Sequence, residues 1–445
     1  MNMLLVGTGA VGETILRALK ERDPKGKWLK KVVVSDVDGD RAGKVASMLQ
    51  DSRFIPAELD ARNEKEIAAL IEKHQCDFVM DAASPFVCNT IFDGAYQGGA
   101  NYGNMGTFSK PKENPDYEKG LEGCYDLVMG DYHFQKEEEW KKAGQMAVIC
   151  MGIDPGVVDV FARFAADYLF DQLEEVHVKD GGDLHIEDPD HKKIGFGFNV
   201  WTVLDECMNP NVEWDKAKGF ITEPPFAGEE VFHMPCEVGP NRLVKVEHEE
   251  TVLMPRYLQK YGLKKCSFKI GLDEDLTHAL WALEAIGLRN DGEVQVGNVK
   301  VKPRDVVAAV APQPTEYSHQ WAGKMIVGIH CIGTKDGQKR EVFLYQPFEQ
   351  KEAWEKWETQ AVVAQTGCSA ATGIEMIGTG QWNEPGVYGP EYFDAIPFLK
   401  AMKESGLSYG MMEMDSPYKR QRESEDLEIV IKEAMKQVSE KGEKQ

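Results

Sequence analysis

The chain has 445 residues, more than one hydrophobic core usually organises, so we expect two domains. Apolar residues make up 42% of it and the formal net charge is −23, which argues against a disordered chain and against nucleic acid or an anionic membrane surface as a partner. The nine cysteines lack paired spacings, which favours buried thiols over a disulfide framework or a zinc ribbon.

Strands and helices are predicted to alternate over about the first 150 residues. Short apolar runs typical of buried strands occupy 3–6, 31–37, 54–59, 77–80 and 146–151. Amphipathic stretches typical of helices lie between them, one ending near residue 20 and others covering 41–49 and 64–73. This alternation indicates βαβ units and a parallel sheet, so we predict an α/β fold that begins with a Rossmann domain.

The pattern changes at Asp154-Pro155-Gly156, a turn that we take as a domain boundary. A helix is predicted over 157–170. Strand-like runs with few helices between them follow at 175–178, 243–246, 266–270, 324–332 and 342–345. This order predicts an α+β domain with a mixed or antiparallel sheet. The tail from about 416 is highly charged and contains one helical pattern around 427–438.

The first strand leads into a hexapeptide with the G-x-G-x-x-G pattern, Gly7-Thr8-Gly9-Ala10-Val11-Gly12. Its glycines allow a tight turn, a close approach of the backbone to a pyrophosphate, and close packing of helix on strand. The pyrophosphate would lie at the helix N-terminus, where unpaired amides favour an anion. Such a hexapeptide alone also occurs in ordinary turns, but its place between an apolar strand and an amphipathic helix favours dinucleotide binding.

The second strand ends at Asp36-Val37, about the expected distance beyond the last glycine. A carboxylate there accepts hydrogen bonds from the adenosine ribose and repels a 2′-phosphate, so we expect NAD as cofactor. Arg41 could still reach a phosphate, which leaves NADP as the alternative.

Two later turns should line the same cofactor. Asp60-Ala61, after the third strand, would lie beside the adenine. Ala82-Ala83-Ser84-Pro85, after the fourth strand, would lie along the cofactor at the switch point, where small side chains let it approach the backbone. The alternative is that both are ordinary strand-to-helix turns.

Several segments resemble the saccharopine dehydrogenase-like family of NAD(P)-dependent oxidoreductases, over nearly the whole chain up to about residue 407. Within that family they are most similar to the carboxynorspermidine dehydrogenases. Besides the glycine loop, the segments are Gly152-Ile153-Asp154-Pro155-Gly156, Cys236-Glu237-Val238-Gly239-Pro240, Glu247-His248-Glu249-Glu250, Gly386-Val387-Tyr388 and Glu391-Tyr392-Phe393-Asp394.

The resemblance implies chemistry at a carbon–nitrogen bond, with an imine made or broken and a hydride transferred. Carboxynorspermidine dehydrogenases condense an amine with aspartate semialdehyde reductively, and the resemblance leads one to expect NADPH and a Ser-Arg-Thr type sequence after the second strand. This chain instead has Ser35-Asp36-Val37-Asp38, which favours NAD and the oxidative direction. We therefore expect an NAD(P)-dependent dehydrogenase that acts on CH–NH or CH–NH2 groups of an amino acid or amine. The alternatives are reductive condensation in polyamine biosynthesis, or a dinucleotide-binding sensor without catalysis.

His248 is the leading catalytic candidate, because proton transfer at a substrate nitrogen needs a group that titrates near neutral pH. A strand period would place Val244, Val246, His248 and Glu250 on one face, as in a pocket wall. The alternative is a structural histidine in an edge strand. Asp154, at the domain junction, could bind an amino group or only shape the turn.

Asn199 and Trp201 are candidates for binding the substrate, since an aromatic face can hold an ammonium, although a large aromatic is more often core. The acids and histidines within 183–191 match no zinc or calcium spacing, so we expect no metal.

The family resemblance and the sequence pattern together divide the chain into three parts. Residues 1–153 form the Rossmann domain, 154–375 the α+β substrate-binding domain, and 376–445 a C-terminal segment that returns to the Rossmann domain and ends in the charged tail. No signal peptide and no run of about 18 apolar residues is present, so we expect a cytoplasmic enzyme. The resemblance also implies a homodimer.

Overall fold

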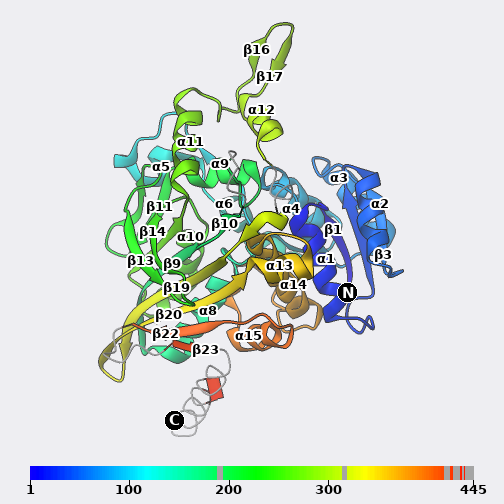
Figure 1. Ribbon diagram of the computed structural model, residues 1–445. Coiled ribbons are helices and arrows are strands. Elements are labelled where there is room, and N and C mark those ends of the chain that lie inside the picture. Colours follow the sequence, from blue (N-terminus) through cyan, green and yellow to red (C-terminus); the bar gives the residue numbers. More distant parts are fainter. Residues whose placement is uncertain (188–193, 313–317, 415–420, 424–430, 433–434, 436–445) are drawn as a thin grey trace.

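The computed structural model describes residues 1–187, 194–312, 318–414, 421–423, 431–432 and 435. Two sheets organise this part of the chain, one in each domain (Figure 1). Most of the helix predicted around 427–438 lies outside the described residues, as do Asp188, Asp190 and His191 of the acidic segment. No helix in the described ranges is long and apolar enough to cross a lipid bilayer.

A seven-stranded parallel sheet forms the first domain, in the order β21-β8-β5-β4-β1-β2-β3. The strands are β1 (Asn2–Val6), β2 (Lys31–Asp36), β3 (Phe54–Glu58), β4 (Phe78–Asp81), β5 (Asn101–Gly103), β8 (Met146–Val148) and β21 (Gly386–Tyr388). The chain crosses from β3 to β4 on the other side of β1, so the order reverses between β1 and β4. This reversal is the switch point of a Rossmann fold, which confirms the predicted α/β class.

Helices cover both faces of this sheet. They are α1 (Ala10–Arg22), α2 (Gly39–Met48), α3 (Glu64–His74), α4 (Cys88–Gln97), α6 (Asp131–Phe134), α7 (Glu137–Ala143), α14 (Ala361–Gly378) and α15 (Ala395–Glu404). α14 packs against α1, where a Cβ on Gly367 would approach the Thr14 side chain to 2.7 Å. The predicted division at 375/376 therefore falls inside α14, and the return to the first domain begins with that helix.

The second domain is built on a ten-stranded mixed sheet. Its path is β12-β11-β15-β9-β19-β20-β22-β23, and β14 joins β15 and pairs with β13. β9 and β15 are parallel, and their other pairings are antiparallel. The strands are β9 (Gln172–Gly182), β11 (Asn211–Asp215), β12 (Gly219–Glu223), β13 (Glu230–Met234), β14 (Gly239–Val244), β15 (Lys265–Gly271), β19 (Lys324–Lys335), β20 (Gln338–Glu349), β22 (Gly410–Glu413) and β23 (Gln421–Glu423). The α+β prediction is thus confirmed.

The remaining helices of this domain lie around the sheet and between the domains. They are α8 (Val157–Phe164) with a π-turn at Ala165–Leu169, α9 (Val200–Met208), α10 (Glu250–Leu258) and α13 (Gln350–Trp357). The short elements are α5 (Gly120–Cys124), β6 (Lys110–Pro111), β7 (Tyr125–Leu127), β10 (His185–Ile186), β18 (Trp321–Ala322), η1 (Pro85–Val87), η2 (Tyr117–Lys119), η4 (Gln259–Tyr261), η5 (Ser318–Gln320) and η6 (Pro390–Tyr392).

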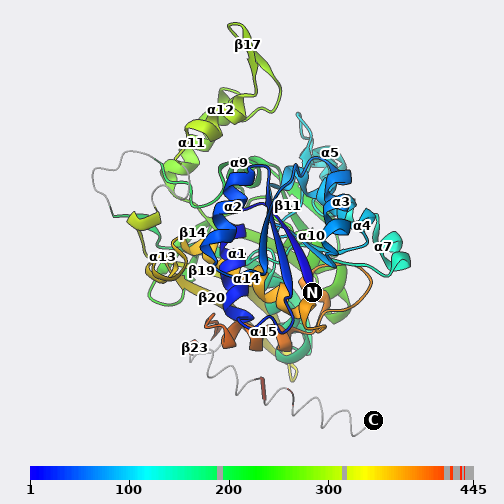
Figure 2. The ribbon, with the colours of Figure 1, turned by 90° about the vertical axis from the view of Figure 1, so that its right-hand side faces the viewer.

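An arm projects from the second domain away from both sheets (Figures 1 and 2). It consists of α11 (Glu274–Ala285), the hairpin β16 (Val294–Val296) and β17 (Val299–Val301), and α12 (Pro303–Val310), which returns to the body. The hairpin tip is exposed, but α12 buries one face against α9.

One hydrophobic core joins the domains. Because side chains alternate along a strand, Met3 and Leu5 of β1 face this core, whereas Leu4 and Val6 face a separate one. The shared core continues through α8 and α14 to β9 and β19. The interdomain region is therefore firmly packed behind the carboxyl ends of the parallel strands, and this packing sets the position of the groups described next. None of the nine cysteines forms a disulfide, and eight of them are buried.

Candidate active site between the domains

The three glycines of the loop after β1 have different surroundings. Gly7 has a φ of +98°, and a Cβ on it would lie 2.7 Å from the Ala82 carbonyl oxygen. A Cβ on Gly12 would lie 2.2 Å from the Gly7 carbonyl oxygen. Gly9 has an ordinary φ of −62° and open space within 4 Å of its Cβ position. The fold thus requires the first and third glycines, while the second leaves the N-terminus of α1 accessible, as a dinucleotide diphosphate requires.

Asp36 lies beside this loop at the end of β2. The Thr8 amide and hydroxyl donate to its Oδ2 at 2.8 and 2.7 Å. Burial opposes ionisation of Asp36, but these hydrogen bonds lower its pKa below the usual value. Arg41 donates from Nε to the Thr8 carbonyl at 3.1 Å, so a carboxylate and a guanidinium share the rim. The Val37 side chain is 65% exposed at the same rim, where an adenine could cover it.

The turns after β3 and β4 differ in what they offer. The Asp60 carboxylate pairs with Arg62 at 2.7 Å, and hydrogen bonds from Arg62 lower its pKa to about 2. Ala61 follows it in the same turn. Ala82 and Ala83 lie after β4, Ala82 against Gly7, and the Ser84 hydroxyl is buried without a hydrogen-bond partner among the described residues. Pro85 begins η1. Ser84 is thus the polar group left for a ligand along this edge.

A histidine–carboxylate pair lies on the second-domain side. His248 Nδ1 and Glu250 Oε2 are 2.5 Å apart, and the imidazole stacks on the Phe268 ring at 3.6 Å with an angle of 3°. Both side chains are buried. Burial opposes protonation of His248, but Glu250, with Glu206 and Asp154 further off, raises its pKa well above the usual value.

The predicted strand around this pair is wrong. β14 ends at Val244, and α10 begins at Glu250, so His248 lies in the connecting loop. The loop is held by Thr251, whose hydroxyl donates to the His248 carbonyl at 2.8 Å. The Glu249 carbonyl starts the helix by accepting from the Val252 and Leu253 amides. The His248–Glu250 contact therefore joins a loop residue to the first residue of α10 and does not come from a strand period.

Three further acids surround His248, and each comes from a different element. Asp154 follows β8 at the domain junction, Asp180 lies in β9, and Glu206 lies in α9. Asp154 Oδ2, Asp180 Oδ1 and Glu250 Oε1 are buried without partners among the described residues. We call Asp154, Asp180, Glu206, His248 and Glu250 the acidic cluster.

Loss of hydration raises the pKa values of Asp154, Asp180 and Glu206. The pKa of Asp154 rises well above the usual value through burial and repulsion by Asp180. Burial raises the pKa of Asp180 to about 7, although His248 opposes the change. Burial raises that of Glu206 to about 8. Two carboxyls with pKa values near 7 and 8, in the surroundings of one imidazole, are typical of sites that bind cations or move protons.

More acids lie behind the cluster. Glu391 is fully buried with neither carboxylate oxygen partnered in the described part of the chain, and burial raises its pKa to about 8. Asp159 accepts from the Gly156 amide at 2.7 Å. Glu247 accepts from Asn209 at 2.8 Å, and Glu249 accepts from the Thr107 amide at 2.6 Å. These contacts hold the loop before α10 against both domains.

The sequence reasoning missed Asp180, Glu206 and Glu391. Asp180 could have been found, because it continues the buried period-two face of Val176 and Val178 in β9. Glu206 offers no such signal, since it lies in a helix beside buried residues without being in their stripe.

The two predicted substrate residues lie at the start of α9. Asn199 is exposed and caps that helix, accepting from the Thr202 amide at 3.2 Å. Trp201 is half-buried and packs against the shared core. Within the described ranges, no three His, Cys, Asp or Glu side chains are arranged as metal ligands.

A glycine loop at the switch point of a parallel sheet, facing a buried acid–imidazole cluster, defines an NAD(P)-dependent oxidoreductase. Residues 3–148 match the family profile "Saccharopine dehydrogenase NADP binding domain", and residues 152–407 match "Saccharopine dehydrogenase C-terminal domain". The chain belongs to the saccharopine dehydrogenase family.

Relatives match along nearly their whole length. The chain is 28% identical over 431 residues to carboxynorspermidine synthase of Vibrio cholerae, covering 93% of this chain and 98% of that protein. It is 22% identical over 423 residues to carboxyaminopropylagmatine dehydrogenase of Synechocystis, covering 92% and 96%. Apo saccharopine dehydrogenase (L-Glu forming) from Saccharomyces cerevisiae shares the fold, with a TM-score of 0.63, 14% identity, and coverage of 95% and 99%.

Replacing Asp36 with alanine is expected to weaken NADH binding and to shift the NADPH-to-NADH preference toward NADPH by roughly 10-fold or more, because a ribose acceptor and a charge opposed to the 2′-phosphate are both lost. Calorimetric titration with both nucleotides measures the shift. Asp40→Asn, which removes an exposed charge four residues along, is the control. Unchanged NADH affinity in Asp36→Ala would remove Asp36 from the ribose site.

Proposed function

We propose that this protein joins an amine, most simply a diamine, to an amino-acid aldehyde by NAD(P)H-dependent reductive condensation. The acidic cluster around His248 is the observation that carries the proposal. Two relatives support it, since the names carboxynorspermidine synthase and carboxyaminopropylagmatine dehydrogenase both describe an amine that carries a carboxylated aminopropyl unit. Their matches span both domains, so the likeness includes the elements that supply the cluster.

The cluster suits a substrate with two cationic nitrogens. Asp154, Asp180 and Glu206 bring carboxyl groups close to His248, and Asp154 and Asp180 each have a buried oxygen with no partner in the described residues. An ammonium donates three hydrogen bonds and would satisfy those oxygens. One nitrogen of a diamine can be held in this way while the other, losing its proton, becomes the nucleophile.

His248 is the group proposed to move the proton at the reacting atoms. Because Glu250 is in contact with Nδ1, Nε2 is the ring nitrogen that would exchange a proton with the substrate. The neutral amine attacks the aldehyde carbon and forms the carbon–nitrogen bond. The resulting carbinolamine hydroxyl accepts a proton from His248 and leaves as water, which gives the iminium. The nucleotide, when bound, supplies the hydride that reduces this carbon.

The nucleotide would lie across the first domain. We propose that the amides at Gly9 to Gly12 hold its diphosphate, that Asp36 holds the ribose, and that the Ala82–Pro85 turn lies along it, with the Ser84 hydroxyl free to donate. Val37, Asp60 and Ala61 remain candidates beside the adenine. We also propose that the protein is a cytoplasmic homodimer. The cytoplasm is in keeping with nine cysteines that form no disulfide, and light scattering of the purified protein tests the dimer.

The direct test is consumption of NADH or NADPH in the presence of aspartate semialdehyde and an amine. Short diamines, putrescine and agmatine form the amine panel, and mass spectrometry identifies the product. The expected product is the secondary amine, formed only when aldehyde, amine and nucleotide are all present. Normal nucleotide binding without turnover on any amine, in either direction, would contradict the proposal and favour a sensor.

The KM for the diamine is expected to fall as the pH rises through the values near 7 and 8 at which Asp180 and Glu206 titrate. Below those values the free site holds protons that a bound ammonium must displace, so affinity increases with pH over that window. Asp180→Asn should raise the diamine KM by roughly 10- to 100-fold and flatten this dependence.

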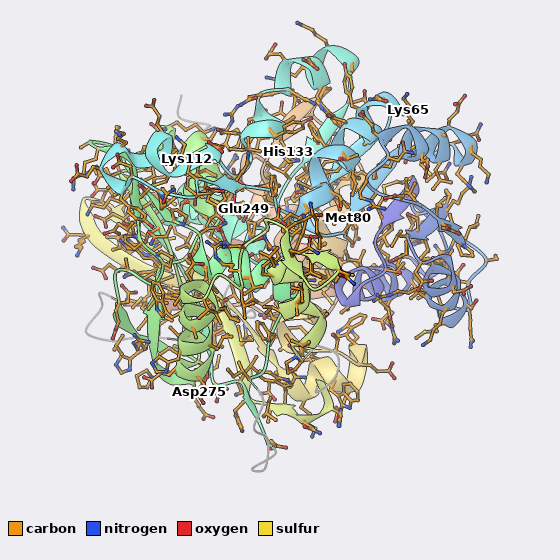
Figure 3. All side chains as sticks on the ribbon, turned by 90° about the horizontal axis from the view of Figure 1, so that it is seen from above. Lys65, Met80, Lys112, His133, Glu249 and Asp275 are labelled. Carbon is orange, nitrogen blue, oxygen red and sulfur yellow. The ribbon has the colours of Figure 1, made fainter. Side chains whose placement is uncertain are left out.

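The matched control is Asp275→Asn on α11. Asp275 is exposed and lies at the edge of the molecule, well away from Glu249 beside the cluster (Figure 3). The Asp275→Asn substitution removes the same charge as Asp180→Asn and should leave the KM for the diamine unchanged. An equal rise in both variants would assign the effect to net charge and not to the cluster.

A further inference from the structure

Arg304 is a buried cation on an exposed arm. Its neighbours in α12, Val306 and Val310, are 44% and 75% exposed, but Arg304 itself is only 6% exposed. The side chain points back from the arm to the body, where it meets residues of both domains. A charged side chain is rarely buried unless it has a partner or a function.

The partners of Arg304 bracket the gap between the domains. Nη2 donates to Asp205 Oδ2 at 2.9 Å, and Asp205 is the neighbour of Glu206 in α9. The guanidinium carbon lies 4.8 Å from the centre of the Phe86 ring. Phe86 lies in η1, two residues after Ser84, at the carboxyl end of β4. Arg304 therefore contacts both domains, through α9, which also supplies Glu206, and through the turn that follows Ser84.

Arg304 has a buried donor that makes no hydrogen bond within the described residues. Its Nε is buried without a hydrogen-bond partner among the residues that the structure describes. A buried, unsatisfied donor on a charged group is costly, and a ligand acceptor would remove that cost. The contact with the Phe86 ring and the hydrogen bond from Nη2 to Asp205 hold the guanidinium at two points, which limits where Nε–H can point.

Two lysines near the cluster are engaged by carboxylates, as Arg304 is by Asp205, but Arg304 also has a buried Nε–H without a partner in the described part of the chain. Lys179, adjacent to Asp180, pairs with Glu230. Lys245, which precedes the His248 loop, pairs with Glu213 and Glu223. The cluster itself is acidic and would repel an anion. A substrate that carries a carboxylate must therefore place it away from the cluster, and the buried Nε–H of Arg304 is a cationic donor outside the cluster.

We infer that Arg304 binds the α-carboxylate of the amino-acid aldehyde substrate, with Nε–H as the donor. This inference rests on the proposed function. On this inference the acidic cluster binds the amine, and Arg304 binds the substrate that carries the carboxylate. With the carboxylate held at Arg304 and the amine held at the acidic cluster, the aldehyde carbon would point toward the amine nitrogen.

The test compares two aldehydes that differ only in the carboxylate: aspartate semialdehyde and 3-aminopropanal. For Arg304→Gln we expect the KM for aspartate semialdehyde to rise roughly 10- to 100-fold, with kcat changed much less. The KM for 3-aminopropanal should stay as in the wild type. Arg304→Lys should recover part of the affinity, since it keeps the charge without the planar fork.

Arg289→Gln is the matched control, because Arg289 lies on the same arm but donates Nε to Glu284 and Nη1 to Asn209. It should not distinguish the two aldehydes. Equal losses with both aldehydes in Arg304→Gln would make Arg304 a latch between the domains and overturn the inference, as would no change with either.

Calorimetry separates this inference from the proposed reaction. L-Homoserine and 3-aminopropanol are the unreactive alcohols that correspond to the two aldehydes. If homoserine binds in an Arg304-dependent way, 3-aminopropanol does not bind, and the protein turns over neither aldehyde, the carboxylate site is supported and the proposed function is contradicted. Homoserine binding that is absent, or indifferent to Arg304→Gln, would overturn the site.

Discussion

Replacing His248 with glutamine is expected to lower kcat by roughly 100- to 10,000-fold and to leave the affinity for NAD(P)H nearly unchanged. The imidazole is the group proposed to protonate the departing hydroxyl, and glutamine has no titratable proton to give. The nucleotide residues belong to the other domain, so their contacts are not altered. Steady-state kinetics and calorimetric titration with the nucleotide measure the two quantities separately.

Glu250→Gln provides the companion measurement. Glu250 raises the pKa of His248, so its neutral replacement should lower that pKa. The imidazolium is then lost at a lower pH, and the alkaline limb of the kcat profile for condensation should move to lower pH. A thermal melt of each variant checks that the loop before α10 is still folded, because His248 stacks on Phe268. Wild-type kcat in folded His248→Gln would return His248 to a structural role.

Gly9→Ala is expected to reduce NAD(P)H affinity by roughly 10- to 1,000-fold without lowering the melting temperature. The Cβ position of Gly9 has open space around it, and its φ of −62° suits alanine, so the fold should tolerate the methyl group. The same methyl group would occupy the place where the diphosphate must approach the helix amides. Calorimetry and a thermal melt on the same sample give the two readouts.

Gly12→Ala is the contrasting variant. Its Cβ would lie 2.2 Å from the Gly7 carbonyl, so the turn between β1 and α1 must shift, and both the melting temperature and the affinity should fall. Comparing Gly9→Ala with Gly12→Ala therefore separates a loss of nucleotide binding from a loss of folding stability. Wild-type nucleotide affinity in Gly9→Ala would place the nucleotide elsewhere.

The parallel sheet was predictable because each of its central strands is a continuous apolar run. β1, β2 and β4 are buried on both faces, which removes any need for polar residues in them. β5 spans only Asn101–Gly103 and has no such run, so it was missed. β21 is equally short and pairs with β8 about 240 residues earlier in the chain, a contact that no local pattern encodes.

The candidate site likewise contains residues that local sequence predicts and residues that only the tertiary structure brings together. The glycine loop and Asp36 are predictable because the chemistry is local: a strand, a turn and a helix start within one βαβ unit. The predicted His248–Glu250 pair does lie together, although the local structure assigned to it was wrong. Asp180, Glu206 and Arg304 come from a strand, a helix and a distant arm, so no window of sequence contains them together.

Sequence alone determined the class of fold and the position of the glycine loop between β1 and α1, because apolar periodicity and glycine spacing express local geometry. Tertiary structure alone decided which acids come together around His248 and that Arg304 contacts both domains. The physical reason is that burial changes what a carboxyl or guanidinium can do, and burial depends on every element packed around it.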